Sequence, residues 1–136
     1  MLRRTVLVVG DDPSQRVVVD LLRGAPDLAA AGAATVEEAL DFLRGISVHL
    51  VMLDLRALGA GGLEAIERMR LSPATRGIPL VAMVPASWPH TEQAARLAGC
   101  AALLSDGVDP EALVESVREV IADSTIRRWV SGRERL

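Results

Sequence analysis

The stretch Leu50-Val51-Met52-Leu53-Asp54 decides the fold of this chain, because an uninterrupted apolar run ends there in a carboxylate. The run is too short for a helix and is typical of a strand buried on both faces of a parallel sheet. Open α/β sheets bind their ligands in the crevice outside the carboxyl ends of such strands. Asp54 is therefore the first candidate for a functional residue.

A second apolar run, Thr5 to Val9, ends after Gly10 in the acidic pair Asp11 and Asp12. It has the same pattern as the first run, so we predict a second buried strand. The carboxyl ends of neighbouring parallel strands meet at one edge of a sheet. If the two strands are neighbours, their acids share one pocket.

Strand and helix signals alternate along the chain, which predicts five βα units and a mainly parallel sheet. The first helix is expected to begin at Asp12-Pro13, an acidic cap followed by proline at the first helical position, and to end near Gly24. The remaining strands are predicted at 28–33, 78–84 and 100–104. One helix is predicted at 35–45, where a capping box begins it, and a second helix follows the glycine-rich turn at 59–62. Two more helices are predicted, one at 91–97 and one that begins at 109. The fold class is α/β, a doubly wound five-stranded parallel sheet with flanking helices.

The 136 residues, half of them apolar, suit one domain at residues 1–122 with a C-terminal extension of the last helix, or tail, at 123–136. The formal charge of −3 and the scattered arginines argue against nucleic-acid binding, and no apolar segment is long enough to span a membrane. Cys100 is the only cysteine, which fits a reducing, cytoplasmic setting. His49 and His90 lack partners at metal-ligand spacing and are assigned to the surface or to loops.

Several blocks of this sequence occur in the order of a known family. They are the acidic pair before the first helix, His49 to Leu55 with Gly62-Leu63-Glu64, Ile78 to Met83, Ala98-Gly99-Cys100, and Asp109-Pro110-Glu111. Together, from about Thr5 to Ala122, they resemble the chemotaxis-type response-regulator receiver domain of two-component signalling. The resemblance implies a flavodoxin-like fold with Asp54 as phosphoacceptor. It implies no enzyme beyond an aspartyl phosphoacceptor.

The family holds a Mg²⁺ ion between an acidic pair, the acceptor aspartate and a backbone carbonyl, because phosphoryl transfer requires neutralised charge. The resemblance places Asp11, Asp54 and the carbonyl of Arg56 there. The first acid of the pair is Gly10 in this chain, which leaves Asp12 as the helix cap. A one-residue bulge at Gly10 would instead bring Asp12 to the metal. We therefore expect Mg²⁺ binding to be weakened.

Two further family positions are altered. The switch hydroxyl that ends the fourth strand is replaced by Val84, which cannot donate a hydrogen bond. The lysine after the fifth strand is replaced by Asp106, so an attraction becomes a repulsion of roughly 3 kcal/mol for unit charges about 5 Å apart at an effective dielectric near 20. The side chain of Arg56 either pairs with Asp54 or Asp106 in place of the missing cation, or is an exposed loop residue.

We therefore expect a stand-alone, degenerate receiver domain (a pseudo-receiver) that acts as a protein-interaction module, with phosphorylation at Asp54 weak, altered or absent. Its partner would be a histidine kinase or another signalling protein, bound at the helices beside the fourth and fifth strands. A homodimer through the last helix and Trp129 is also expected. Two alternatives stay open. One is a working phosphoacceptor, supported by Asp11 and Asp54, and the other is a flavodoxin-like small-ligand binder, opposed by the lack of a phosphate loop.

Overall fold

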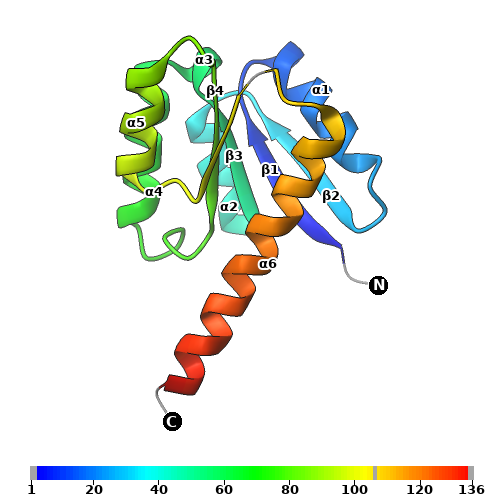
Figure 1. The fold of residues 1–136 in the computed structure, drawn as a ribbon, viewed down its shortest axis with the longest axis vertical. Coiled ribbons are helices and arrows are strands. Elements are labelled where there is room, and N and C mark those ends of the chain that lie inside the picture. The colour runs from blue at the N-terminus through cyan, green and yellow to red at the C-terminus, as the bar shows by residue number, and fades with distance from the viewer. Residues whose placement is uncertain (1–2, 106, 135–136) are drawn as a thin grey trace.

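The computed structural model describes residues 3–105 and 107–134, with their side chains as far as Asp123. In this part of the chain, strands and helices alternate (Figure 1). The elements are β1 (Arg4–Val9), α1 (Asp12–Arg23), β2 (Leu28–Ala33), α2 (Val36–Gly45), β3 (Leu50–Asp54), α3 (Leu55–Leu58), α4 (Ala60–Leu71), β4 (Leu80–Val84), α5 (Pro89–Ala98), β5 (Ala102–Ser105) and α6 (Pro110–Glu134).

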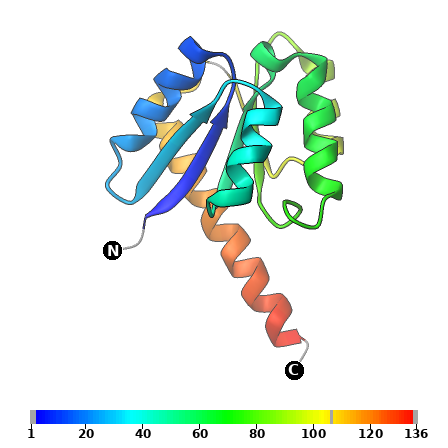
Figure 2. The same cartoon turned by 180° about the vertical axis from the view of Figure 1, so that it is seen from behind.

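The described strands form one five-stranded sheet in the order β2-β1-β3-β4-β5, and every pair is parallel. Helices α1 and α6 cover one face of this sheet, and α2, α4 and α5 cover the other (Figures 1 and 2). This arrangement confirms the predicted fold class. It also confirms that the two strands that end in acids are neighbours, because β1 pairs with β3.

The core lies in two layers because successive side chains of each central strand point to opposite faces. Val6 and Val8 of β1 pack towards α1 and α6, whereas Leu7 and Val9 pack towards α2 and α4. All four are buried, and burial of one such side chain contributes about 1.5–3 kcal/mol. These uninterrupted apolar strands rigidly position the residues that follow them at the carboxyl edge.

The start of α1 differs from the prediction by one residue. Asp11, not Asp12, is the N-cap residue, and its side chain makes no capping hydrogen bond. Asp12 is the first helical residue and Pro13 the second, a place that proline tolerates because its missing N–H has no helical partner there. The predicted end of the helix near Gly24 is confirmed, since α1 ends at Arg23.

The segment after β3 differs from the sequence prediction more than the start of α1 does. The predicted glycine-rich turn is limited to Gly59, whose φ of +60° is a conformation that favours glycine. Gly61 and Gly62 lie inside α4, and a short helix, α3, begins directly after Asp54. Gly62 permits this packing, because a Cβ atom on it would lie 2.5 Å from Cδ2 of Leu55 in α3.

Three other predicted boundaries shift by two residues or so. Helix α5 begins at Pro89 rather than at residue 91, again because the first helical turn accepts proline. Strand β4 begins at Leu80, and β5 covers Ala102–Ser105. No described helix combines the length and apolar character that a membrane crossing requires.

Helix α6 packs on the sheet through Leu113, Val117 and Ile121, as the sequence predicts. The oxygen Oδ2 of Asp109 accepts a hydrogen bond from the Glu111 N–H at 3.2 Å, at the start of the helix. The second half of α6 leaves the body of the domain (Figures 1 and 2). The side chain of Trp129 lies outside the described residues, and the division into residues 1–122 and 123–136 stays a prediction.

Candidate functional site

The candidate site lies at the carboxyl edge of the sheet, where β1 and β3 end side by side. Val9 pairs with Leu53 in the register of the two strands, so Gly10 and Asp54 follow them as neighbours. A Cβ atom on Gly10 would lie 3.0 Å from Cβ of Asp54. Gly10, which replaces the first acid of the family's pair, therefore lies directly against Asp54. A side chain at position 10 would require one of the two strand ends to shift.

The half-buried carboxylate of Asp54 is the N-cap of α3. Its Oδ1 atom accepts hydrogen bonds from the backbone N–H groups of Arg56 at 3.1 Å and Ala57 at 3.4 Å. These N–H groups belong to the first helical turn, where no helical carbonyl can accept their hydrogen bonds. The carboxylate predicted to be the phosphoacceptor thus has one oxygen, Oδ1, held by backbone donors.

The described residues lack a complete set of protein ligands for the Mg²⁺ ion that the resemblance implies. The carbonyl of Arg56 lies within α3, and carbonyls in a helix point towards its C-terminal end, away from the capping carboxylate. Asp11 is exposed beside the start of α1. Among the residues that the structure describes, no group of three or more His, Cys, Asp or Glu side chains could hold a metal ion. Metal binding by Asp11 and Asp54 stays a prediction that this arrangement does not support.

Asp12 has a different partner from the predicted ones. Its carboxylate accepts a hydrogen bond from Arg16 at 2.9 Å, and both side chains are exposed. The bulge that would bring Asp12 to a metal is not formed, because the β1–β2 register is regular and Gly10 N–H continues it to the Ala33 carbonyl at 3.0 Å. Asp12 therefore supports α1 through an exposed ion pair, which contributes little free energy.

The switch position is an apolar residue buried in the sheet. Val84 ends β4 and is 3% exposed. Its partner in the β4–β5 register is Ser105, an exposed residue that ends β5. Sequence reasoning missed Ser105, because only the register shows that a hydroxyl lies opposite Val84 on the next strand.

A cavity of about 320 Å³ lies beside this edge, between α5 and β5. Its lining includes Val84, Leu103, Leu104 and Ser105, together with Glu92 and Arg96 of α5. Those two α5 side chains form an ion pair at 3.4 Å. The cavity lining thus combines apolar side chains with charged and polar ones, as protein-interaction surfaces commonly do.

The predicted roles of Asp106 and of the Arg56 side chain stay predictions. Asp106 lies outside the described residues. The side chain of Arg56 is exposed at the edge of the site, and its pairing with Asp54 or Asp106 stays a prediction.

Comparison with known proteins gives a consistent result. No family model matches the chain. The polar-differentiation response regulator DivK of Brucella ovis is 23% identical over 129 residues, which cover 90% of this chain and 100% of the relative. The homologous regulator of Brucella anthropi is 24% identical over 127 residues, which cover 89% of this chain and 98% of the relative.

Solved structures share the fold. A CheY-like response-regulator receiver domain from Methanospirillum hungatei JF-1 has a TM-score of 0.79 at 19% identity, and the match covers 92% of this chain and 98% of that one. The chemotaxis response regulator CheY4 of Vibrio cholerae has a TM-score of 0.75 at 21% identity, with 87% and 98% covered. Sequence similarity along about nine tenths of the chain and the shared five-stranded fold together show that this chain is similar to response-regulator receiver domains and has their fold.

Proposed function

We propose that this receiver domain is a signalling module that binds its partners without needing phosphorylation of Asp54. The observation that carries the proposal is the set of residues around Asp54, whose Oδ1 caps α3 by accepting from two backbone N–H groups. A phosphoacceptor has to present its oxygen to the incoming phosphoryl group. Oδ2 takes no part in these two hydrogen bonds, so the phosphorylation of Asp54 depends on the groups placed around the carboxylate.

The neighbouring positions support the same conclusion. Transfer of a phosphoryl group depends on cations and hydrogen-bond donors placed around the developing charge. Val84 offers no donor at the end of β4, and the described residues hold no cluster of three or more His, Cys, Asp or Glu side chains that could bind a metal ion. At the family's lysine position the sequence has Asp106, an anion that opposes a phosphorylated Asp54. We infer that phosphorylation at Asp54 is weak or absent.

The proposed binding face is the cavity between α5 and β5 with the surface around it. Trp88, directly before α5, is 38% exposed, and Leu97 on α5 is 80% exposed. Exposed large apolar side chains of this kind are frequent anchors of protein interfaces. Response regulators interact with signalling proteins such as kinases, and we propose a protein of that class, in the cytoplasm, as the partner.

Intact-mass measurement after incubation with acetyl phosphate and Mg²⁺ tests the proposal. We expect no phosphoryl adduct on the wild-type chain or on Asp54→Asn, while a receiver domain with complete phosphorylation machinery is labelled in the same buffer. An adduct on the wild type that is absent from Asp54→Asn would instead make this chain a working phosphoacceptor. Circular dichroism of each sample checks that the proteins are folded.

A further inference from the structure

A groove runs between α1 and α6, on the side of the sheet opposite α2, α4 and α5. Its volume is about 510 Å³. Leu21 and Ala25, from α1 and the turn after it, and Val114 from α6 supply its apolar lining. Glu111 and Glu115 of α6 line it as well. We call this surface the α1–α6 groove.

The α6 side of the groove is acidic. Glu111 and Glu115 are exposed and one helical turn apart, and the exposed Glu119 follows one turn later. Like charges at this spacing repel one another and destabilise a helix, so a cationic neighbour would relieve them. The groove therefore fits a ligand with an apolar face and positive charges.

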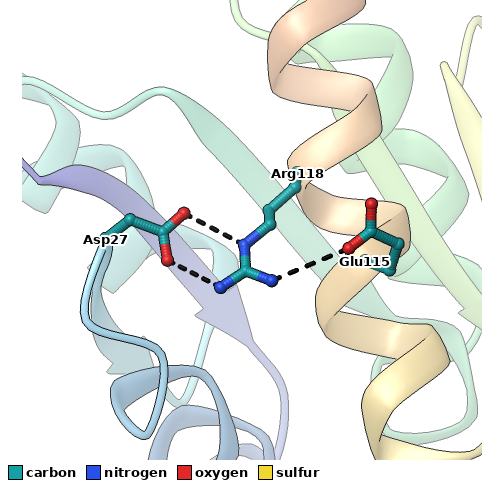
Figure 3. Close-up of polar contacts among 3 residues, drawn as sticks. All are labelled: Asp27, Glu115 and Arg118. Atoms are coloured by element: carbon teal, nitrogen blue, oxygen red, sulfur yellow. Dashed lines mark hydrogen bonds and ion pairs between the residues drawn. The ribbon is translucent and has the colours of Figure 1, made fainter.

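Arg118 cancels only part of this charge, because Asp27 is a closer partner of its guanidinium than Glu115 is. Its Nε and Nη2 atoms donate to the two carboxylate oxygens of Asp27 at 3.0 and 2.7 Å, and Nη1 lies 3.6 Å from Glu115 (Figure 3). This bidentate pair joins α6 to the turn before β2. Arg118, the cationic residue of the groove lining, thus pairs with Asp27 and Glu115 and not with Glu111.

A segment of the chain itself has the complementary composition. Residues 124–136 contain four arginines and one glutamate, together with Ile126, Trp129 and Val130. The side chains of this segment lie outside the described residues, and its chemistry is read from the sequence. Its own groove is out of reach, because α6 is continuous to Glu134 and a helical rise of about 1.5 Å per residue places Arg128 about 20 Å along the axis from Val114.

We propose that residues 124–136 of a second copy of this chain dock in the α1–α6 groove, and that the exchange is reciprocal. The result is a two-fold symmetric dimer in which the α6 helices run antiparallel, so that each acidic half meets a basic half. Parallel, in-register pairing would bring the acidic halves together. The dimer uses a different face from the α5–β5 surface of the proposed function and leaves that surface available.

A charge-swap experiment tests this dimer. One variant carries Glu111→Lys with Glu115→Lys, and the other carries Arg127→Glu with Arg128→Glu. In a dimer of either variant alone, the groove and the docked segment carry charges of the same sign and repel each other. We therefore expect the dimer dissociation constant of each variant to be at least about tenfold higher than that of the wild type. An equimolar mixture restores both contacts, and a heterodimer should form.

Sedimentation equilibrium over a concentration series is the measurement. The matched control is Glu64→Lys with Glu67→Lys, which makes the same charge change on exposed positions of α4 and should leave the dissociation constant unchanged. Raising the salt concentration should weaken the wild-type dimer, because salt screens exposed charges.

Three results would overturn the proposal. The first is a wild-type chain that stays monomeric at all concentrations, which would leave the groove to another partner. The second is a mixture of the two charge-swap variants that stays monomeric. The third is a wild-type dimer that becomes stronger as the salt concentration rises. The salt series needs no variant, so it remains decisive if a variant fails to fold.

Discussion

Replacing Asp54 by alanine is the most direct check of its capping role. The change removes the oxygen that accepts from the N–H groups of Arg56 and Ala57 at 3.1 and 3.4 Å. Both N–H groups then lose their protein acceptor at the start of α3. Asparagine at the same position retains one side-chain oxygen that can accept both hydrogen bonds.

The expected magnitude follows from measured helix caps. Loss of an N-cap side chain costs about 0.5–2 kcal/mol, typically about 1 kcal/mol, whereas asparagine and aspartate are nearly equivalent caps. For a domain of this size, about 1 kcal/mol corresponds to a melting temperature roughly 3–5 °C lower. We therefore expect Asp54→Ala to be less stable than the wild type by about 1 kcal/mol and Asp54→Asn to differ little from it.

Urea unfolding in the presence of EDTA, repeated with millimolar Mg²⁺, measures these differences. A metal ion that binds only the folded chain would add stability that grows with its concentration, and Asp54→Asn would lose that gain. We expect no such gain for either protein. Asp54→Ala as stable as the wild type, or a Mg²⁺-dependent gain confined to the wild type, would refute the capping argument.

Three other predictions concern separate parts of the fold. The hydrogen bond from Arg118 holds the pKa of Asp27 below its ordinary value of 3.8. The stabilisation from this pair is therefore present above pH 3.8 and is lost as the pH falls through the lower pKa of Asp27 in the folded protein. We expect the stability of Asp27→Asn to depend less steeply on pH in the acid range than that of the wild type. Gly62→Ala should lower the free energy of unfolding by about 1–3 kcal/mol, because the new Cβ atom overpacks the contact with Leu55. Gly61→Ala has open space around the new Cβ atom and should raise the free energy of unfolding by about 0.5–1 kcal/mol. Urea titration measures both changes. Burial raises the pKa of the Cys100 thiol to about 11, so a thiol reagent at mildly alkaline pH should label the native protein far more slowly than the urea-unfolded one; equal rates would contradict this.

Much of the fold was predictable because its signals are local. The apolar run before Asp54, Thr35 at the start of α2 and the helical spacing of Leu113 and Val117 each specify one element without long-range information. Thr35 accepts from the Glu38 N–H at 3.1 Å, as its capping box predicts. Neighbouring parallel strands then bring β1 and β3 to a common edge, so the place of the site follows from the order of the elements.

The character of the site was not predictable in the same way. Whether Asp54 faces a metal or caps a helix depends on Leu55–Leu58, a segment too short to show helical periodicity. The close approach of Leu55 in this segment to Gly62 is visible only in the three-dimensional structure.

His49 illustrates a second kind of limit. The sequence assigns it to the surface or to a loop, and it lies in the loop before β3. It is half-buried there, and its Nδ1 atom accepts a hydrogen bond from the backbone N–H of Thr5 at 3.0 Å. That contact joins residues 44 positions apart, and no local pattern reports it.

The two edge strands have a consequence for the behaviour of the protein in concentrated solution. An edge strand exposes unpaired backbone groups that can recruit another chain into a growing sheet. Strand β2 consists of one leucine, four alanines and one glycine, with no β-branched or aromatic residue, and β5 is four residues long. Residues of this kind are poor strand formers, and short edges offer few hydrogen bonds. The valine-rich segment of β1, which would aggregate readily if exposed, is enclosed between β2 and β3, so the native fold keeps it away from solvent and from other chains.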